Sequence, residues 1–298
     1  MKKIIILIII ISNFSSEVIC QNILSLEDDN IFEEDKTSIS ELFHTFLTSQ
    51  ELLITKPFIN FSTGFSDSFL PAKLHMDNMP RTNNFTFEYG FLLLDTNSIF
   101  PQIIDYSSQF AYIESNTNKY GFFKRNKLDL YDNQFNFGVG LRSGLGYQTD
   151  AYELYLLHTS SFLWGYFDYD VYEASSFFNA FDNRYKFGWR GSAGLEFRFT
   201  KHLLLGFSYE HSNIYSGFEF LPWAGSWLVD NILQRWIDLL DPVFIKEIGY
   251  SYPLLKFLYK NTVSIVMSEI RNIKQYYPFN SDYSLLHRKL SLNLKLFF

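Results

Sequence analysis

The sequence predicts an all-β protein: a transmembrane antiparallel up-and-down β-barrel of about ten strands. Three observations lead to this fold class. The last nine residues alternate between apolar and polar side chains, the chain begins with a segment typical of exported proteins, and no later stretch has the roughly 18 apolar residues of a transmembrane helix. A membrane barrel needs apolar side chains only at every second position, which also fits a mean hydropathy of -0.06.

The C-terminal segment is the clearest strand of the chain. One face carries Leu290, Leu292, Leu294, Leu296 and Phe298, and the other carries Lys289, Ser291, Asn293 and Lys295. Because successive strand side chains point to opposite faces, this ribbon is apolar outside and polar inside. It resembles the closing strand of bacterial outer-membrane β-barrels. The resemblance implies contact with outer-membrane lipid and recognition of the strand ending in Phe298 by the barrel-assembly machinery.

The N-terminal segment has the order of a secretory signal peptide. Lys2 and Lys3 precede the apolar run 4–11, and cleavage is expected after Cys20. The alternative is a lipoprotein acylated on Cys20. Under the cleavage interpretation the mature chain has no cysteine, which excludes disulfides and cysteine-based zinc sites. We therefore expect a signal peptide at 1–20, a periplasmic N-terminal segment or plug at 21–55, and the barrel at 56–298.

The composition supports a membrane barrel and argues against several classes of partner. The 33 Phe and 20 Tyr raise the aromatic content to 19%, which suits the aromatic girdles of a membrane barrel. The net charge of -7 and the absence of Lys/Arg clusters argue against nucleic acid as a partner. No Gly-rich phosphate loop precedes a helix and no His/Asp/Glu spacing suggests a metal site, so no cofactor or metal is expected.

The parity of the sequence, that is, the alternation of apolar and polar residues at successive positions, predicts the strands. Alternating segments lie at 59–66, 84–93, 109–112, 135–147, 152–156, 186–199, 202–210, 262–268 and 290–298. A tenth strand at about 248–259, which contains Pro253, is needed for an even count. In this interpretation Phe110 and Tyr112 are outward apolar residues.

The spacing between these segments gives the expected topology. Tight turns are predicted at 148–151, 200–201 and 260–261, and long stretches at 70–82, 116–130, 162–185, 217–247 and 272–286. Outer-membrane barrels have short periplasmic turns and long external loops. Counting back from Phe298 places every tight turn on the periplasmic side.

The predicted lumen is lined by charges of both signs. The inward positions carry Glu88, Arg142, Glu153, Lys186, Arg190, Glu196, Arg198 and Glu210. Two interpretations follow: a cross-linked polar core, or a narrow charged pore. The first is favoured because side chains can largely fill the interior of a barrel this small.

One amphipathic helix is predicted at 226–240, within the external loop 217–247. Ser226 is its expected N-cap, and Asp241-Pro242 is expected to end it. Its apolar face carries Trp227, Leu228, Ile232, Trp236 and Leu239 or Leu240. Three roles stay open: a helix lying in the membrane interface, a lid over the barrel mouth, and a partner-binding helix.

Two groups of residues suggest catalytic chemistry. His158 and Ser160 share the outward face of the strand 150–160, and a His beside a Ser is the base–nucleophile pair of acyl hydrolases. His158-Thr159-Ser160 resembles the His-x-Ser pair of outer-membrane lipid A deacylases, although Ser161 stands where that family has Asn. The family's acid corresponds best to Glu173 in a predicted loop. The resemblance covers only these three residues.

The second group of residues resembles the omptin proteases. It consists of Asp168-Tyr169-Asp170 in the predicted loop 162–185 and His211 on the strand 202–212. Tyr209 stands where that family has an Asp. The sequence thus predicts a non-enzymatic surface or structural barrel or a minor pore, with no ligand indicated. The alternative is an outer-membrane hydrolase that acts on lipid A through His158 and Ser160, or on peptides.

Overall fold

The computed structural model describes residues 56–69, 81–96, 100–117, 131–149, 152–170, 181, 184–279 and 281–298. All of them belong to one compact unit, Thr55–Phe298. The predicted signal peptide 1–20, the predicted segment 21–55 and Glu173 lie outside the described residues, so those predictions stay predictions.

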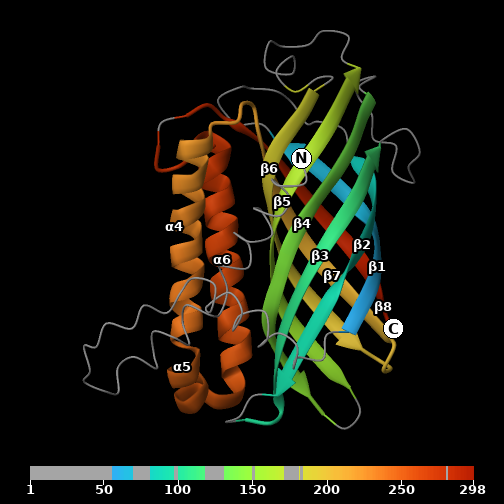
Figure 1. The fold of residues 1–298 in the computed structure, drawn as a ribbon, viewed down its shortest axis with the longest axis vertical. Coiled ribbons are helices and arrows are strands. Elements are labelled where there is room, and N and C mark those ends of the chain that lie inside the picture. The colour runs from blue at the N-terminus through green and yellow to red at the C-terminus, as the bar shows by residue number, and fades with distance from the viewer. Residues whose placement is uncertain are drawn as a thin grey trace, which may run out of the picture. The chain divides into compact units, whose positions relative to one another are not determined.

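The described strands form one closed antiparallel barrel, in which each strand pairs with its neighbours in the chain and β8 pairs with β1 (Figure 1). The strands are β1 Lys56–Phe69, β2 Thr82–Thr96, β3 Ile103–Thr117, β4 Tyr131–Gln148, β5 Glu153–Asp170, β6 Arg184–Arg198, β7 Leu203–Tyr215 and β8 Ser284–Phe297. The barrel has eight strands, so the predicted count of about ten is wrong. The up-and-down topology is confirmed.

The two surplus strands are helical. The segments predicted as strands at 248–259 and 262–268, with a turn at 260–261, fall at the end of α5 Asp241–Ile248, in the short 3-10 turn Gly249–Ser251 and in α6 Tyr252–Ile273. A short apolar run is compatible with both the two-residue period of a strand and the 3.6-residue period of a helix. The decisive signal is a polar residue at every fourth position, because four-residue spacing keeps side chains on one helix face. These residues are Lys256, Lys260, Ser264 and Ser268, all of them buried.

The predicted inside-out pattern is confirmed for the closing strand. Leu292 on the outward face is 65% exposed, whereas Lys295 on the inward face is fully buried. On β3 the predicted parity is wrong. Phe110 and Tyr112 are buried in the lumen, and Ile113 lies outside, half exposed. Four residues were too few to set the phase of this strand.

The helix predicted in the segment 217–247 is present as α4 Phe220–Leu239. It starts earlier than expected, and its N-cap residue Glu219 makes no side-chain cap. Ser226 is therefore not the cap. It is buried within the helix, and its Oγ accepts a hydrogen bond from Arg271 Nε at 3.2 Å. Among the described residues, no helix reaches the length and average hydropathy expected of a membrane-crossing helix.

Helices α4 and α6 form an antiparallel hairpin that stands beside the barrel, and α6 contacts strands β4 to β8 (Figure 1). At one rim the backbone N–H of Ser216 donates to Gln275 Oε1 at 3.1 Å. At the opposite end the Tyr147 hydroxyl donates to the carbonyl of Tyr250 at 2.8 Å. The hairpin therefore runs the full height of the barrel.

Candidate functional site

The lumen holds two groups of paired charges. The first ionic cluster is formed by Glu88, Arg142, Glu196 and Lys295, which come from β2, β4, β6 and β8. Arg142 Nη2 lies 3.0 Å from Glu88 Oε2, and Lys295 Nζ lies 2.7 Å from both carboxylate oxygens of Glu196. The Asn60 amide donates to Glu88 at 2.8 Å. Two acids and two bases thus neutralise one another across the barrel.

The second ionic cluster is formed by Glu114, Arg190, Glu210 and Lys289, from β3, β6, β7 and β8. Arg190 Nη1 lies 3.4 Å from Glu114 Oε2, and Arg190 also pairs with Glu210. Lys289 pairs with Glu114 and lies 3.0 Å from Glu210. All four side chains are less than 10% exposed. Such pairing is what makes buried charges tolerable, because an unpaired charge would lose its hydration without compensation.

Two aromatic rings of β3, Phe110 and Tyr112, explain why the inward and outward faces of this strand are the reverse of those predicted. The Arg142 guanidinium lies 4.7 Å from the ring centre of Phe110, and that of Arg190 lies 4.3 Å from the ring centre of Tyr112. A cation over a ring face is attracted to it, most strongly where water is excluded. These two rings thus support one arginine of each ionic cluster.

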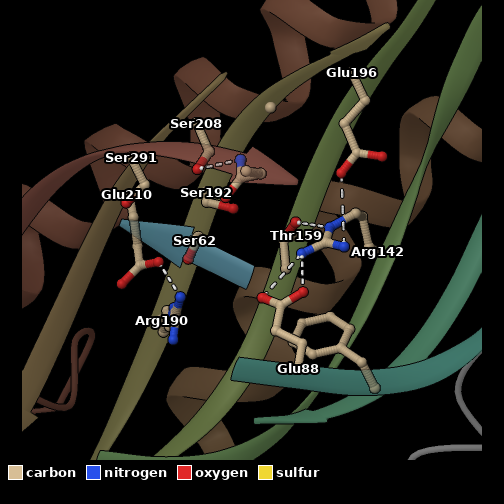
Figure 2. Close-up of a pocket in the computed structure, with 13 residues that line it drawn as sticks. Ser62, Glu88, Arg142, Thr159, Arg190, Ser192, Glu196, Ser208, Glu210 and Ser291 are labelled. Atoms are coloured by element: carbon tan, nitrogen blue, oxygen red, sulfur yellow. Dashed lines mark hydrogen bonds and ion pairs between the residues drawn. The ribbon is translucent and has the colours of Figure 1, made fainter. Parts of the chain in front are cut away.

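Two cavities among the described residues of the lumen are small. A cavity of about 20 Å³ lies between the two clusters, and a second of about 10 Å³ lies beside the second cluster. A buried water needs a cavity volume of about 10–15 Å³, so the larger cavity has room for roughly one or two waters. Figure 2 shows Glu88 against Arg142 and Glu210 against Arg190 at the larger cavity.

Most of the predicted inward charges are in these networks. Arg198 Nη1 also pairs with Glu153 Oε2 at 2.7 Å, whereas Lys186 is half-buried and donates to the carbonyl of Ser216. The parity analysis missed Glu114. It lies on β3, in phase with Phe110 and Tyr112, and extending that strand by two residues would have found it.

A second polar network lies outside the barrel, between its wall and α6. The ring Nδ1 of His158 lies 3.0 Å from Asn261 Oδ1, and His211 Nε2 lies 3.0 Å from Ser264 Oγ. We call this contact the helix–barrel seam, and define it by the pairs His158–Asn261, His211–Ser264 and Asn213–Ser268. All six residues are buried.

A glycine brings α6 this close to the wall. Gly191 on β6 lies between β5 and β7, paired with Ser160 and His211. A Cβ at Gly191 would lie 2.5 Å from Ser264 Oγ and 2.6 Å from His211 Nε2. A larger residue would therefore displace the Ser264 hydroxyl and the His211 ring from their contact.

The two residues of the predicted hydrolase site keep their predicted face but enter different surroundings. His158 and Ser160 both lie on the outward side of β5. His158 is only 8% exposed because α6 covers it, and its Nδ1 forms a hydrogen bond with Asn261 Oδ1. Ser160 is half-buried. The hydrolase hypothesis stays a prediction.

The omptin-like residues are not brought together. Asp168, Tyr169 and Asp170 end strand β5 and do not form a loop as predicted. His211 pairs with Gly191 of β6, which in turn pairs with Ser160 of β5. Ser160 lies eight residues before Asp168 on the same strand. At about 3.3 Å per residue, Asp168 and His211 lie about 26 Å apart along the strands. His211 is also covered by α6.

No protein-family model matches the chain, and no curated protein matches it. Solved structures with a similar arrangement exist. Neisserial surface protein A (NspA) is 8% identical with a TM-score of 0.36, and the match covers 81% of this chain and 97% of that one. Two structures of Ail, the attachment invasion locus protein of Yersinia pestis, one in complex with the heparin analogue sucrose octasulfate, are 10% and 11% identical. Their TM-scores are 0.34 and 0.33, and the matches cover 82% of this chain and 97% and 99% of Ail. Likenesses this distant carry no argument about the role of this chain.

Proposed function

We propose that this chain is an outer-membrane β-barrel with a closed lumen, which serves as a structural or surface barrel and not as a pore. The observation that carries the proposal is the pair of ionic clusters that cross the lumen. Their ion pairs join strands from around the whole barrel, and the larger cavity between them measures about 20 Å³. A hydrated ion needs far more room than roughly two waters.

The exterior supports a membrane location. Large apolar side chains on the outward face are half exposed, among them Phe85, Tyr89, Phe91, Phe135 and Phe207. Water-soluble monomers rarely expose contiguous apolar patches beyond a few hundred Å². A closed barrel also leaves no unpaired sheet edge, which lipid would not tolerate.

The connections support the orientation expected from the sequence. The segments that join β2 to β3, β4 to β5 and β6 to β7 are short and lie at one end of the barrel. The other connections are long. Outer-membrane barrels place the short turns in the periplasm, so we place Phe298 on that side.

Single-channel recording tests the closed lumen. The purified protein in a planar bilayer should give no unitary conductance steps. A matched triple variant, Arg142→Ser with Glu196→Ser and Lys295→Ser, removes most of the first ionic cluster and should produce measurable steps or greater leak. Steps from the wild type at the same protein density would contradict the proposal.

The alternative function, a lipid A acyl hydrolase, needs its own test. His158 and Ser160 do share the outward face, as such an enzyme would require. Mass spectrometry of lipid A from cells that express the wild type or His158→Ala decides the matter. Loss of one acyl chain with the wild type only would make the chain a deacylase. Identical spectra would remove this hypothesis.

A further inference from the structure

We propose that the α4–α6 hairpin lies inside the bilayer beside the barrel, with its exposed face against lipid acyl chains and its polar face sealed on the barrel wall. This inference goes beyond the closed lumen and rests only on the proposed membrane location. It makes the hairpin part of the lipid-facing surface of the protein.

The first support is that the hairpin is amphipathic in the opposite sense to a helix of a water-soluble protein. The most exposed residues of the two helices are uncharged, and all but Thr262 are apolar or aromatic; the charged residues Arg235, Asp238 and Glu269 are half-exposed. In α4 the most exposed residues are Phe220, Leu221, Leu228, Ile232, Leu233, Trp236 and Leu239; in α6 they are Leu254, Leu255, Leu258, Tyr259, Thr262, Val266 and Ile273. A helix exposed to water normally puts its charges outside.

The polar residues of α6 are instead turned inward. Its buried residues include Lys256, Lys260, Asn261, Ser264, Ser268, Arg271 and Asn272. The cations are paired: Arg271 Nη1 lies 3.0 Å from Asp230 Oδ2, and Lys260 Nζ lies 2.7 Å from Asp238 Oδ1. Lys256 pairs with Asp238 and Asp241. Ionisable residues inside a membrane are found paired and facing protein in this way.

The barrel wall beneath α6 gives the second, independent support. Where other outward positions carry exposed Phe, Tyr and Leu, the covered wall carries His158, His211 and Asn213. Hydrocarbon would leave these polar groups unsatisfied. Asn213 Nδ2 donates to the carbonyl of Ser268 at 3.0 Å, and Ser268 Oγ donates to Asn213 Oδ1 at 2.7 Å. The hairpin thus supplies the partners that lipid lacks and replaces the apolar surface that this wall does not have.

The third support is length. At 1.5 Å per residue, α4 is about 30 Å long and α6 about 33 Å long. The hydrocarbon core of a bilayer is about 30 Å thick. The hairpin also reaches both ends of the barrel, as the contacts Ser216–Gln275 and Tyr147–Tyr250 show. Barrel and hairpin therefore have matching heights.

Aromatic rings continue from the barrel onto the hairpin at both ends. The ring centre of Trp223 on α4 lies 5.8 Å from that of Phe162 on β5 and 5.5 Å from that of Phe187 on β6. At the opposite end the ring centres of Tyr250 and Phe100 lie 5.5 Å apart. Aromatic side chains concentrate at the two membrane interfaces. The exposed apolar face of the hairpin is thus continuous with that of the barrel.

Site-directed spin labelling tests the inference. In full-length protein carrying Cys20→Ser and reconstituted in phospholipid liposomes, single cysteines at Leu258 and Val266 report the hairpin. Phe91 and Ile113 report the barrel exterior, and Asp282 reports the rim. We expect the hairpin labels to match Phe91 and Ile113, with oxygen access several-fold above that of a water-soluble nickel chelate. Asp282 should show the reverse.

The outcomes separate this inference from the proposed location. If Leu258 and Val266 behave like Asp282 while Phe91 and Ile113 stay in lipid, the hairpin lies in water and the inference fails alone. If the other four labels all behave like Asp282, the membrane location fails as well. Labels at Leu258 and Val266 that are shielded from both reagents and show spin–spin broadening would place a second copy of the chain on this face, and would also overturn lipid contact.

A measurement on native tryptophan guards against a label that disturbs folding. Trp236 on α4 is 67% exposed. Phospholipids brominated on their acyl chains should quench wild-type fluorescence, and Trp236→Phe should remove a measurable share of that quenching. The difference between the two proteins gives the emission of Trp236, and a Trp236 emission that the brominated lipids leave unquenched would overturn the inference.

Discussion

The lumen and the helix–barrel seam are both buried and polar, but they lie on opposite sides of the same wall. On β5, Thr159 points into the lumen and accepts a hydrogen bond from Arg142 Nε at 3.1 Å, while its neighbour His158 points into the seam. The lumen holds paired full charges that join most strands. The seam holds mainly neutral hydrogen bonds. The buried cations of α6 are paired within the helices, and Glu269 of α6 pairs with Arg288 of β8.

This difference shows where each network gains its stability. A charge in the lumen is held by partners from several strands, so its loss leaves another buried charge unpaired. A seam residue gives up only one or two neutral hydrogen bonds. We therefore expect lumen substitutions to cost more free energy than seam substitutions, and the following tests would confirm or break that ranking.

The largest effect is expected for Glu114→Ala. The substitution leaves Lys289 and Arg190 with one carboxylate fewer in the second ionic cluster. Breaking a buried ion pair in this way costs about 3–5 kcal/mol of unfolding free energy. Reversible urea unfolding in liposomes measures it. The control is Ser115→Ala, the next residue on the exposed face, which should change stability by less than about 0.5 kcal/mol.

A charge on the outer face of α6 should come next. Val266→Arg places a cation on the exposed side of the helix, at the level we assign to hydrocarbon. The expected cost is about 2.5–3.5 kcal/mol, as for Arg at the centre of a membrane helix. A change below about 0.5 kcal/mol, equal to that of the rim control Asp282→Arg, would indicate a water-exposed face.

Steric separation of the seam should have an intermediate effect. In Gly191→Val the new side chain meets Ser264 and His211, so these two side chains or α6 itself must shift. Overpacking of this kind costs about 1–3 kcal/mol. The matched control is Gly194→Ala on the same strand, where the nearest atom, Leu157 Cβ, is 3.7 Å from the added Cβ. Equal unfolding midpoints for the two variants would contradict the close approach of helix and wall.

The smallest effect is expected from one seam hydrogen bond. Ser268→Ala removes the hydroxyl that donates to Asn213. Hydrogen bonds between segments in a membrane are worth about 0.6 kcal/mol on average, with about 1.7 as an upper value. Thr262→Ala on the exposed face of α6 is the control. A loss for Ser268→Ala as large as that of Glu114→Ala would reverse the proposed ranking of seam and lumen.

The barrel and much of its lumen could be predicted because alternation is a local property. Each inward charge of β4 and β6 follows from its own neighbours, as does the outward face of β8. The partner of each charge could not be predicted, since Lys289 meets Glu114 only through the register and curvature of the closed barrel. On β3 a four-residue segment was too short to reveal that Phe110 and Tyr112 support the arginines.

The seam could not be predicted while α6 was interpreted as two strands. Residues 262–268 alternate well enough for a strand, and only the wider spacing from Lys256 to Ser268 shows a helix. Once the helix is known, the polar outward residues His158 and His211 have an explanation. They mark the part of the wall that α6 covers.

The hairpin also bears on how the barrel closes. Strands β4 and β5 are joined through the turn at 149–152, whereas β7 and β8 are separated by residues 216–283. For a flexible chain this longer connection would raise the entropy cost of closure by about 2.5 kcal/mol. Pairing of α4 with α6 brings Ser216 and Gln275 together and removes most of that cost. A hairpin that pairs before β8 joins the sheet would therefore lower the entropy cost of closing the barrel.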